Sequence, residues 1–144
     1  MPTHALPNRW RRRRTHNIEF VPARRIRQLG DPVLRQVSTA VRNPDLAAAV
    51  LEDLRDTLHD FQKTHGFGRG ISAAQIGIPE RIIYMEVDGL SYNLINPVFE
   101  YVSEERFALW DDCFSFPDLL VWLERSENVC IRYIGQQGCG ALLI

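Results

Sequence analysis

Apolar residues between Ala47 and Phe61 recur at three- and four-residue steps, the spacing of one face of an α-helix. Just before them, Asn43 suits the N-cap and Pro44 suits the first helical position. The pair His65-Gly66 follows the last periodic turn and favours a helix end. The pattern therefore predicts one helix that begins near Pro44 and ends near His65.

After a glycine-containing connection, the pattern changes to short apolar runs that are typical of strands. Residues 81–87 and 90–95 flank Asp88-Gly89, a two-residue sequence that favours a tight hairpin turn. Further strands are expected at residues 98–102, 107–110, 121–124 and 129–134. One N-terminal helix followed by a meander of strands predicts an α+β fold, with the helix packed on antiparallel strands.

The composition is that of an ordinary globular protein, with 45% hydrophobic and 24% charged residues among 144. It excludes wholesale disorder, a collagen-like repeat and a disulfide-stapled miniature. No run of 18 apolar residues occurs, so we expect no membrane-spanning helix. Three cysteines give no disulfide framework and indicate reduced thiols, which favours a cytoplasmic location.

The charge is divided unevenly along the chain. Residues 1–27 hold eight arginines and one acid, for +7, whereas residues 28–144 hold nine bases and seventeen acids, for −8. We predict a disordered Arg-rich arm over residues 1–25 and one domain over residues 26–144. The arm is an unstructured start, an organelle transit peptide, or an RNA- or ribosome-binding segment, because an arginine run such as Arg9–Arg14 attracts phosphate.

A glycine-rich segment, Gly68–Pro79, lies between the predicted helix and the first strand. Its Gly68-x-Gly70-x-x-Ala73 spacing matches the dinucleotide fingerprint, and Asp88 lies twenty residues further on. That fingerprint must follow a strand and open a helix, whereas here a helix precedes and a strand follows, so we reject a nucleotide site. The segment is then either a structural turn or a backbone that approaches a ligand closely, with Gln75 offering its amide.

Cys113 stands beside two acids, in the sequence Asp111-Asp112-Cys113-Phe114-Ser115-Phe116-Pro117. A cysteine nucleophile needs a base or a positive environment, yet no His lies within forty residues and the acids disfavour a thiolate. A metal ion would itself deprotonate the thiol, although a catalytic metal site needs three protein ligands. A buried, inert cysteine is the remaining alternative.

Taken in order, these segments resemble the peptide deformylase family. The resemblance rests on G-x-G-I-S-A-x-Q-I-G after the helix, on Leu94-Ile95-Asn96-Pro97, on x-x-C-x-S-x-P around Cys113, and on V-x-I-x-Y over Val129–Tyr133. The opening segment Leu29–Arg35 is also similar to that of the family. The resemblance covers about residues 26–138, and five matches in one order argue against chance.

The resemblance implies a metal-dependent amidohydrolase that removes the formyl group from N-formylmethionyl peptides of nascent proteins. The metal of the family is usually Fe²⁺, with Zn²⁺, Ni²⁺ or Co²⁺ as substitutes. By position, Cys113 would be the thiolate ligand, while the Gln75 side chain and the Phe114 backbone N–H would stabilise the oxyanion. Gly70 would contact the substrate backbone. The pocket for the methionyl side chain would be shaped by Ile71, Phe114 and Phe116.

The sequence departs from the family pattern in two places. The usual E-G-C-L-S reads Asp111-Asp112-Cys113-Phe114-Ser115, which indicates a divergent member with altered substrate preference. The H-E-x-x-H helix, which would supply two metal ligands and the catalytic Glu, is absent from residues 1–144. The histidines present, which we interpret as solvated or helix-end residues where they fall in the helix, are His4, His16, His59 and His65.

Three functions follow as alternatives. The first is a deformylase interrupted near Gly138 by a frameshift or premature stop, or one that has lost catalysis, so that this polypeptide alone neither holds iron firmly nor deformylates. The second is a noncatalytic module that binds formyl-methionyl peptides in a Gln75/Phe114 cleft. The third is an RNA- or ribosome-associated protein acting through Arg9–Arg14. Without the last helix, an apolar face should be exposed.

Overall fold

The computed structural model describes residues 23–43, 47–135 and 140–143, and within them the chain forms one α-helix and two β-sheets. The larger sheet has five antiparallel strands in the order β1-β2-β3-β6-β7. A separate ribbon pairs β4 with β5. The strands of the sheet are β1 (Gly70–Ser72), β2 (Ile82–Val87), β3 (Leu90–Val102), β6 (Asn128–Ile134) and β7 (Gly140–Leu143), and those of the ribbon are β4 (Arg106–Asp111) and β5 (Val121–Ser126).

The helix α1 spans Ala47–His65 and confirms the predicted helix. The predicted start at Pro44 lies outside the described residues. At the other end, Gly66 has a positive φ of 78° and its N–H donates to the carbonyl oxygen of Gln62, 2.8 Å away. Glycine adopts this left-handed conformation without strain, which explains why the helix stops where the sequence indicated.

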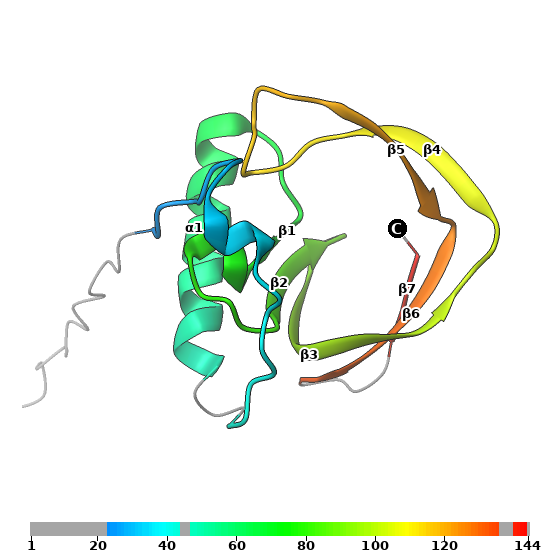
Figure 1. Cartoon of the computed structure of the whole chain (residues 1–144), viewed down its shortest axis with the longest axis horizontal. Coiled ribbons are helices and arrows are strands. Elements are labelled where there is room, and N and C mark those ends of the chain that lie inside the picture. The colour runs from blue at the N-terminus through cyan, green and yellow to red at the C-terminus, as the bar shows by residue number, and fades with distance from the viewer. Residues whose placement is uncertain (1–22, 44–46, 136–139, 144) are drawn as a thin grey trace, which may run out of the picture.

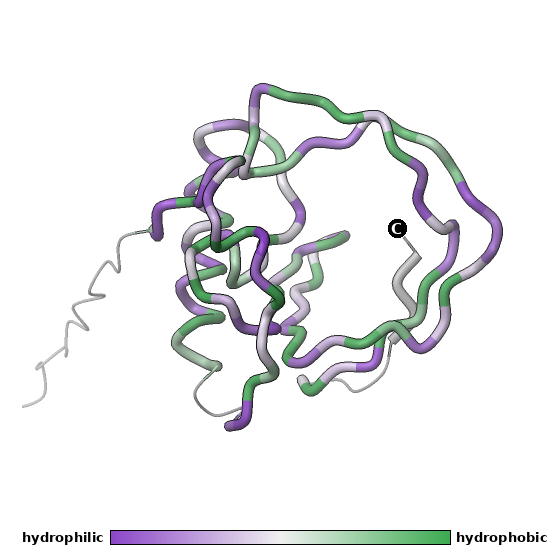
Figure 2. The backbone as a smooth tube through the Cα atoms, viewed as in Figure 1, coloured by the Kyte–Doolittle hydropathy of each residue, from purple (hydrophilic) through white to green (hydrophobic). Residues whose placement is uncertain are grey.

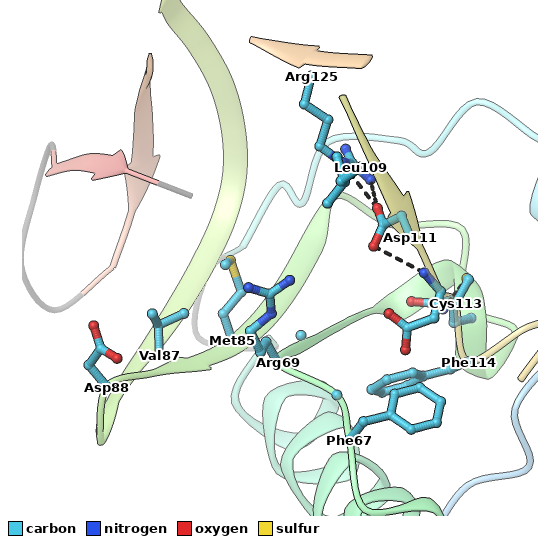
Figure 3. Close-up of a pocket in the computed structure, with 14 residues that line it drawn as sticks. Phe67, Arg69, Met85, Val87, Asp88, Leu109, Asp111, Cys113, Phe114 and Arg125 are labelled. Carbon is cyan, nitrogen blue, oxygen red and sulfur yellow. Dashed lines mark hydrogen bonds and ion pairs between the residues drawn. The ribbon is translucent and has the colours of Figure 1, made fainter. Parts of the chain in front are cut away.

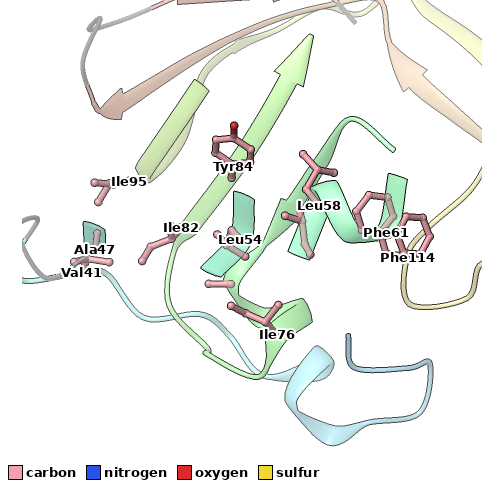
Figure 4. Close-up of a cluster of buried hydrophobic side chains, with 12 residues drawn as sticks. Val41, Ala47, Leu54, Leu58, Phe61, Ile76, Ile82, Tyr84, Ile95 and Phe114 are labelled. Carbon is pink, nitrogen blue, oxygen red and sulfur yellow. The ribbon is translucent and has the colours of Figure 1, made fainter. Parts of the chain in front are cut away.

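The hydrophobic core lies between α1 and the first half of the large sheet (Figure 4). Leu54 and Leu58 have no exposed surface, and they pack with Ile71 of β1 and Ile82 of β2. Figure 1 shows α1 beside β1 and β2, while β3 bends and continues with β6 away from the helix. The helix on an antiparallel sheet confirms the predicted α+β fold.

The long strand β3 turns a corner at Asn96-Pro97, where the sequence had predicted two separate strands. Asn96 has φ 52°, a conformation that asparagine tolerates, and the register with β6 shifts between Ile95 and Val98. Its side chain is fixed by Val41, whose N–H donates to Asn96 Oδ1 at 2.8 Å and whose carbonyl accepts from Nδ2 at 2.9 Å. The predicted break is therefore wrong: it is a bulge held by tertiary hydrogen bonds.

The other strand predictions hold, with small changes at the ends. Asp88 and Gly89 both have positive φ, 52° and 77°, which confirms the tight hairpin turn between β2 and β3. The sequence did not predict the strand β7, nor the short strand β1 and the 3₁₀-helix η3 (Ala73–Ile76), which both lie inside the segment interpreted as a connection. A second 3₁₀-helix, η1 (Pro32–Arg35), follows the N-cap Asp31.

The second half of β3 and the ribbon carry exposed apolar side chains. Phe99 and Tyr101 of β3 are more than half exposed, and so are Trp110 of β4 and Trp122 of β5. Along β4, inward and outward positions alternate, and Figure 2 shows polar and apolar stretches alternating on the ribbon. Among the described residues no helix covers this half of the sheet. No described helix is long and apolar enough to cross a membrane.

A polar cluster ties α1 to β2 beside the core. Glu86 Oε1 accepts a hydrogen bond from the Tyr84 hydroxyl at 2.6 Å and lies 2.7 Å from His59 Nε2 of the helix. The hydrogen bond from Tyr84 lowers the pKa of Glu86, with a further contribution from His59. Burial and the bond to Glu86 raise the pKa of Tyr84 to about 12. Each shift means that folding favours one protonation state of that group.

Replacing Tyr84 with Phe should reduce stability and flatten its pH dependence. In the unmodified chain, the Glu86 contribution is present above its ordinary pKa of 4.5 and is lost as the pH falls through the lowered folded-state value. The Tyr84 contribution is present below 10.0 and is lost as the pH rises towards about 12. We expect Tyr84→Phe to cost about 1–2 kcal/mol near neutrality and to abolish the alkaline loss.

Urea unfolding below pH 4.5, near neutrality and between pH 10.0 and about 12 measures this effect. Tyr92→Phe on the neighbouring strand is the matched control, since no described residue shares a hydrogen bond with that hydroxyl. Equal pH profiles for the two variants would show that the cluster contributes nothing specific.

Candidate functional site

The Gln75 side chain is held in one orientation by the turn that carries it. Its Oε1 accepts from the backbone N–H of Ser72 at 2.9 Å and from the Ser72 hydroxyl at 3.2 Å. Gly77, with φ 89°, ends the 3₁₀-helix immediately afterwards. Because the carboxamide oxygen is engaged, the NH₂ group must point the other way, out of the turn.

Cys113 follows the end of β4, on a tight turn in which the Phe116 N–H donates to the Cys113 carbonyl at 3.0 Å. The next side chain, Phe114, is 5% exposed and points into the core rather than towards solvent. Its ring stacks on Phe61 of α1, with centroids 4.0 Å apart at 17°. Figure 4 shows the two rings face to face, so the turn is anchored to the helix.

The structure brings Gln75 and Cys113 together although they are 38 residues apart. Gln75 Nε2 donates to Cys113 Sγ at 3.5 Å, and Ser115 Oγ lies at the same distance. The backbone N–H of Phe114 has no hydrogen bond to any described residue. The Gln75 amide therefore lies beside the Cys113 sulfur, and the residue that follows Cys113 carries a backbone N–H with no described partner.

These groups line a cavity of about 920 Å³ between β2, β4 and the glycine segment (Figure 3). Gln75, Cys113, Phe114 and Gly70 all lie in its wall, and the roles that the family resemblance implies for them stay predictions. Ile71 and Phe116 do not lie in this wall: Ile71 is 1% exposed in the core, and Phe116 is half-buried in the turn. Their predicted role in shaping a methionyl pocket stays a prediction.

The glycines of the G-x-G sequence allow close packing rather than phosphate binding. Gly68 has φ 118°, and a Cβ there would lie 2.4 Å from Phe114 Cζ. A Cβ on Gly70 would lie 3.0 Å from Met85 Cγ. The segment follows α1 and leads into β1, so the rejection of a dinucleotide fingerprint is consistent with the fold.

Sequence reasoning missed several residues of the cavity wall. Arg69, Met85 and Leu109 contribute to it, and so do Asp111 and Arg125, which form an ion pair across the ribbon. The pair also includes a hydrogen bond from Arg125 Nε to Asp111 Oδ2 at 3.1 Å, and Asp111 Oδ1 accepts from the Asp112 N–H. The alternation of β4 places Leu109 and Asp111 on one face, a signal that could have found them.

The residues present do not form a complete metal centre. No group of three or more His, Cys, Asp or Glu side chains that could hold a metal ion occurs among the described residues. His59 is engaged with Glu86, and His65 stacks on Phe61 with centroids 4.0 Å apart. Cys113 is thus a single sulfur donor, which is one ligand where a catalytic site needs about three.

Comparison with known proteins identifies the family. The family model described as polypeptide deformylase matches residues 23–140, so the chain belongs to the polypeptide deformylase family. The curated peptide deformylase of Pseudothermotoga lettingae is 37% identical over 116 residues, covering 80% of this chain and 64% of that protein. The one from Bartonella tribocorum is 33% identical over 126 residues, covering 82% of this chain and 68% of that protein.

Solved structures show the same fold. The crystal structure of peptide deformylase from Thermotoga maritima aligns with a TM-score of 0.71 and 29% identity, covering 84% of this chain and 79% of that one. The enzyme from Synechococcus elongatus, in complex with actinonin, aligns with a TM-score of 0.74 and 25% identity, covering 99% and 74%. The chain spans about two thirds of the length of the curated relatives that it matches.

Gly68→Ala should disrupt the site by displacing the Phe114 ring. The variant combines an unfavourable positive φ with a Cβ inside the ring, whereas Gly66→Ala has the positive φ alone and open space around it. We expect Gly66→Ala to cost about 1 kcal/mol and Gly68→Ala about 2 kcal/mol more. Denaturant unfolding of both variants measures the difference, and equal losses would show that the ring does not depend on Gly68.

Proposed function

We propose that this chain supplies the carbonyl-binding half of a peptide deformylase site, which binds N-formylmethionyl peptides of nascent proteins. Membership of the family supports this proposal, and the cleft geometry agrees with it. The natural place for such a substrate is the cytoplasm, where nascent chains emerge, and we propose that location for the protein.

The supporting observation is the direction of the Gln75 NH₂ group. With its oxygen bound by Ser72, the amide donates into the cavity next to Cys113, and the Phe114 N–H lies on the adjoining residue. In this proposal, the Gln75 amide and the Phe114 N–H together stabilise the carbonyl oxygen, which gains negative charge during attack on a formyl group. In this proposal the edge strand β1, whose outer side pairs with no described strand, receives the substrate backbone at Gly70.

We further propose that residues 1–144 alone do not deformylate. In the family a metal ion, usually Fe²⁺ and otherwise Zn²⁺, Ni²⁺ or Co²⁺, activates the attacking water. Cys113 would be its thiolate ligand, but the described residues form no group of three metal ligands, and residues 1–144 contain no H-E-x-x-H sequence. The exposed apolar half of the sheet and the open cavity are compatible with a helix supplied by another polypeptide segment.

Complementation with such a helix tests the deformylase proposal. The purified chain should release no formate from a formyl-methionyl peptide and should hold no stoichiometric metal. Adding a helical peptide that carries H-E-x-x-H, together with Co²⁺, should produce a thiolate-to-metal absorption band that Cys113→Ser abolishes. Formate release by the chain alone would contradict the inactivity, and a mixture without the band would contradict the complementation.

A noncatalytic module that binds formyl peptides is the second candidate, and it rests on the same donors. Gln75→Glu removes the side-chain donor and keeps the hydrogen bond that orients the side chain. A carboxylate still accepts from the Ser72 N–H but cannot donate into the cavity. We expect this variant to keep its stability and to bind formyl-Met-Ala-Ser at least about tenfold more weakly.

Isothermal titration with that peptide and its unformylated form measures the effect. Gln36→Glu, on the far side of η1, introduces the same charge change outside the cavity and is the control. Equal affinities for Gln75→Glu and the unmodified chain would rule out the amide as the carbonyl donor. The alternative of RNA or ribosome contact through Arg9–Arg14 concerns residues outside those described, and it stays a prediction.

A further inference from the structure

A short segment that precedes the helix, residues 26–29, contacts both turns of the proposed site, the one that carries Gln75 and the one that carries Cys113. It lies far from Gln75 and Cys113 in the sequence, and the family resemblance gives it no role. Ile26, at its start, packs against the hydrophobic core. We call it the bridging segment.

The bridging segment makes one backbone hydrogen bond to each turn. The Arg27 N–H donates to the carbonyl oxygen of Gln75 at 2.7 Å, and the Leu29 N–H donates to the carbonyl oxygen of Ser115 at 2.8 Å. Gln28 lies between them, and its N–H has no hydrogen bond to a described residue. Alternate N–H groups therefore face the site, as in a strand.

Side chains hold the Arg27 end of the segment in place. The Arg27 guanidinium lies across Gly77, where a Cβ would come within 2.8 Å of Nε, and its Nη1 is 3.5 Å from Asp31 Oδ2. The Leu29 side chain, in contrast, is 66% exposed. At Leu29 the segment thus acts through its backbone N–H and not through side-chain packing.

We propose that the bridging segment is a positioning element, which sets the distance between the Gln75 amide and the Cys113 sulfur. The Gln75 amide touches both Cys113 Sγ and Ser115 Oγ at 3.5 Å, so a shift of either turn would separate donor and thiol. Ser115 is 5% exposed, and water cannot readily replace the Leu29 N–H at its carbonyl. This role in catalysis or binding rests on the proposed function. The accessibility of the Cys113 thiol can nevertheless be measured without a formyl peptide.

Leu29→Pro removes the N–H, whereas Leu29→Ala keeps it and removes only the exposed side chain. Iodoacetamide labelling followed by peptide-resolved mass spectrometry measures Cys113 and Cys130 separately in the same molecule. We expect Leu29→Pro to speed the labelling of Cys113 by about threefold to tenfold, the factor that one lost hydrogen bond represents. The labelling of Cys130 on β6 should stay unchanged, and Leu29→Ala should leave both rates unchanged.

An equal rise at both cysteines would indicate general loosening and would overturn the proposal, and so would an unchanged Cys113 rate. If Leu29→Pro does not fold, amide hydrogen exchange in the unmodified chain tests the proposal instead. The amides of Arg27 and Leu29 should then exchange at least about tenfold more slowly than that of Gln28. Equal exchange across the three residues would overturn it. Failure of formyl-peptide binding in a chain with the predicted labelling would count against the proposed function alone.

Discussion

The packing of the Phe114 ring beneath Gly68 and onto Phe61 is the contact on which the rest of the site depends. It joins the turn that carries Cys113 to the helix α1, and through the helix to the core. An aromatic stack of this kind is rigid, because a buried ring has few rotamers and close neighbours on both faces. The position of the sulfur therefore depends on core packing.

The same constraint explains why two distant turns meet. The ring packs the Cys113 turn onto the helix, and the bridging segment donates hydrogen bonds to the carbonyl oxygens of Ser115 and Gln75. Between them the Gln75 amide has its oxygen bound and its NH₂ group directed at sulfur. Backbone hydrogen bonds and a buried ring thus hold the Gln75 amide in one orientation, and a fixed donor of this kind is what the proposed stabilisation of a carbonyl oxygen requires.

The two halves of the large sheet differ in how completely their apolar side chains are buried. The half that contains α1, β1 and β2 buries its apolar residues in one cluster, which includes Ala73 and Ile76 on either side of Gln75. The half formed by the end of β3, β6 and the ribbon leaves Phe99, Trp110 and Trp122 exposed. Because hydrophobic burial stabilises both folding and association, the exposed half is where another segment would gain most by packing.

The sequence by itself determined the helix, the hairpin, the α+β class and the family, because periodicity, turn residues and motif spacing are local properties of the chain. It also pointed to Gln75 and Cys113. Tertiary structure decided that Asn96 is a bulge held by Val41, that Phe114 is an anchor as well as part of the cavity wall, and that residues 26–29 touch both turns. Those features depend on contacts between residues 48 to 86 positions apart, and no local pattern encodes such contacts.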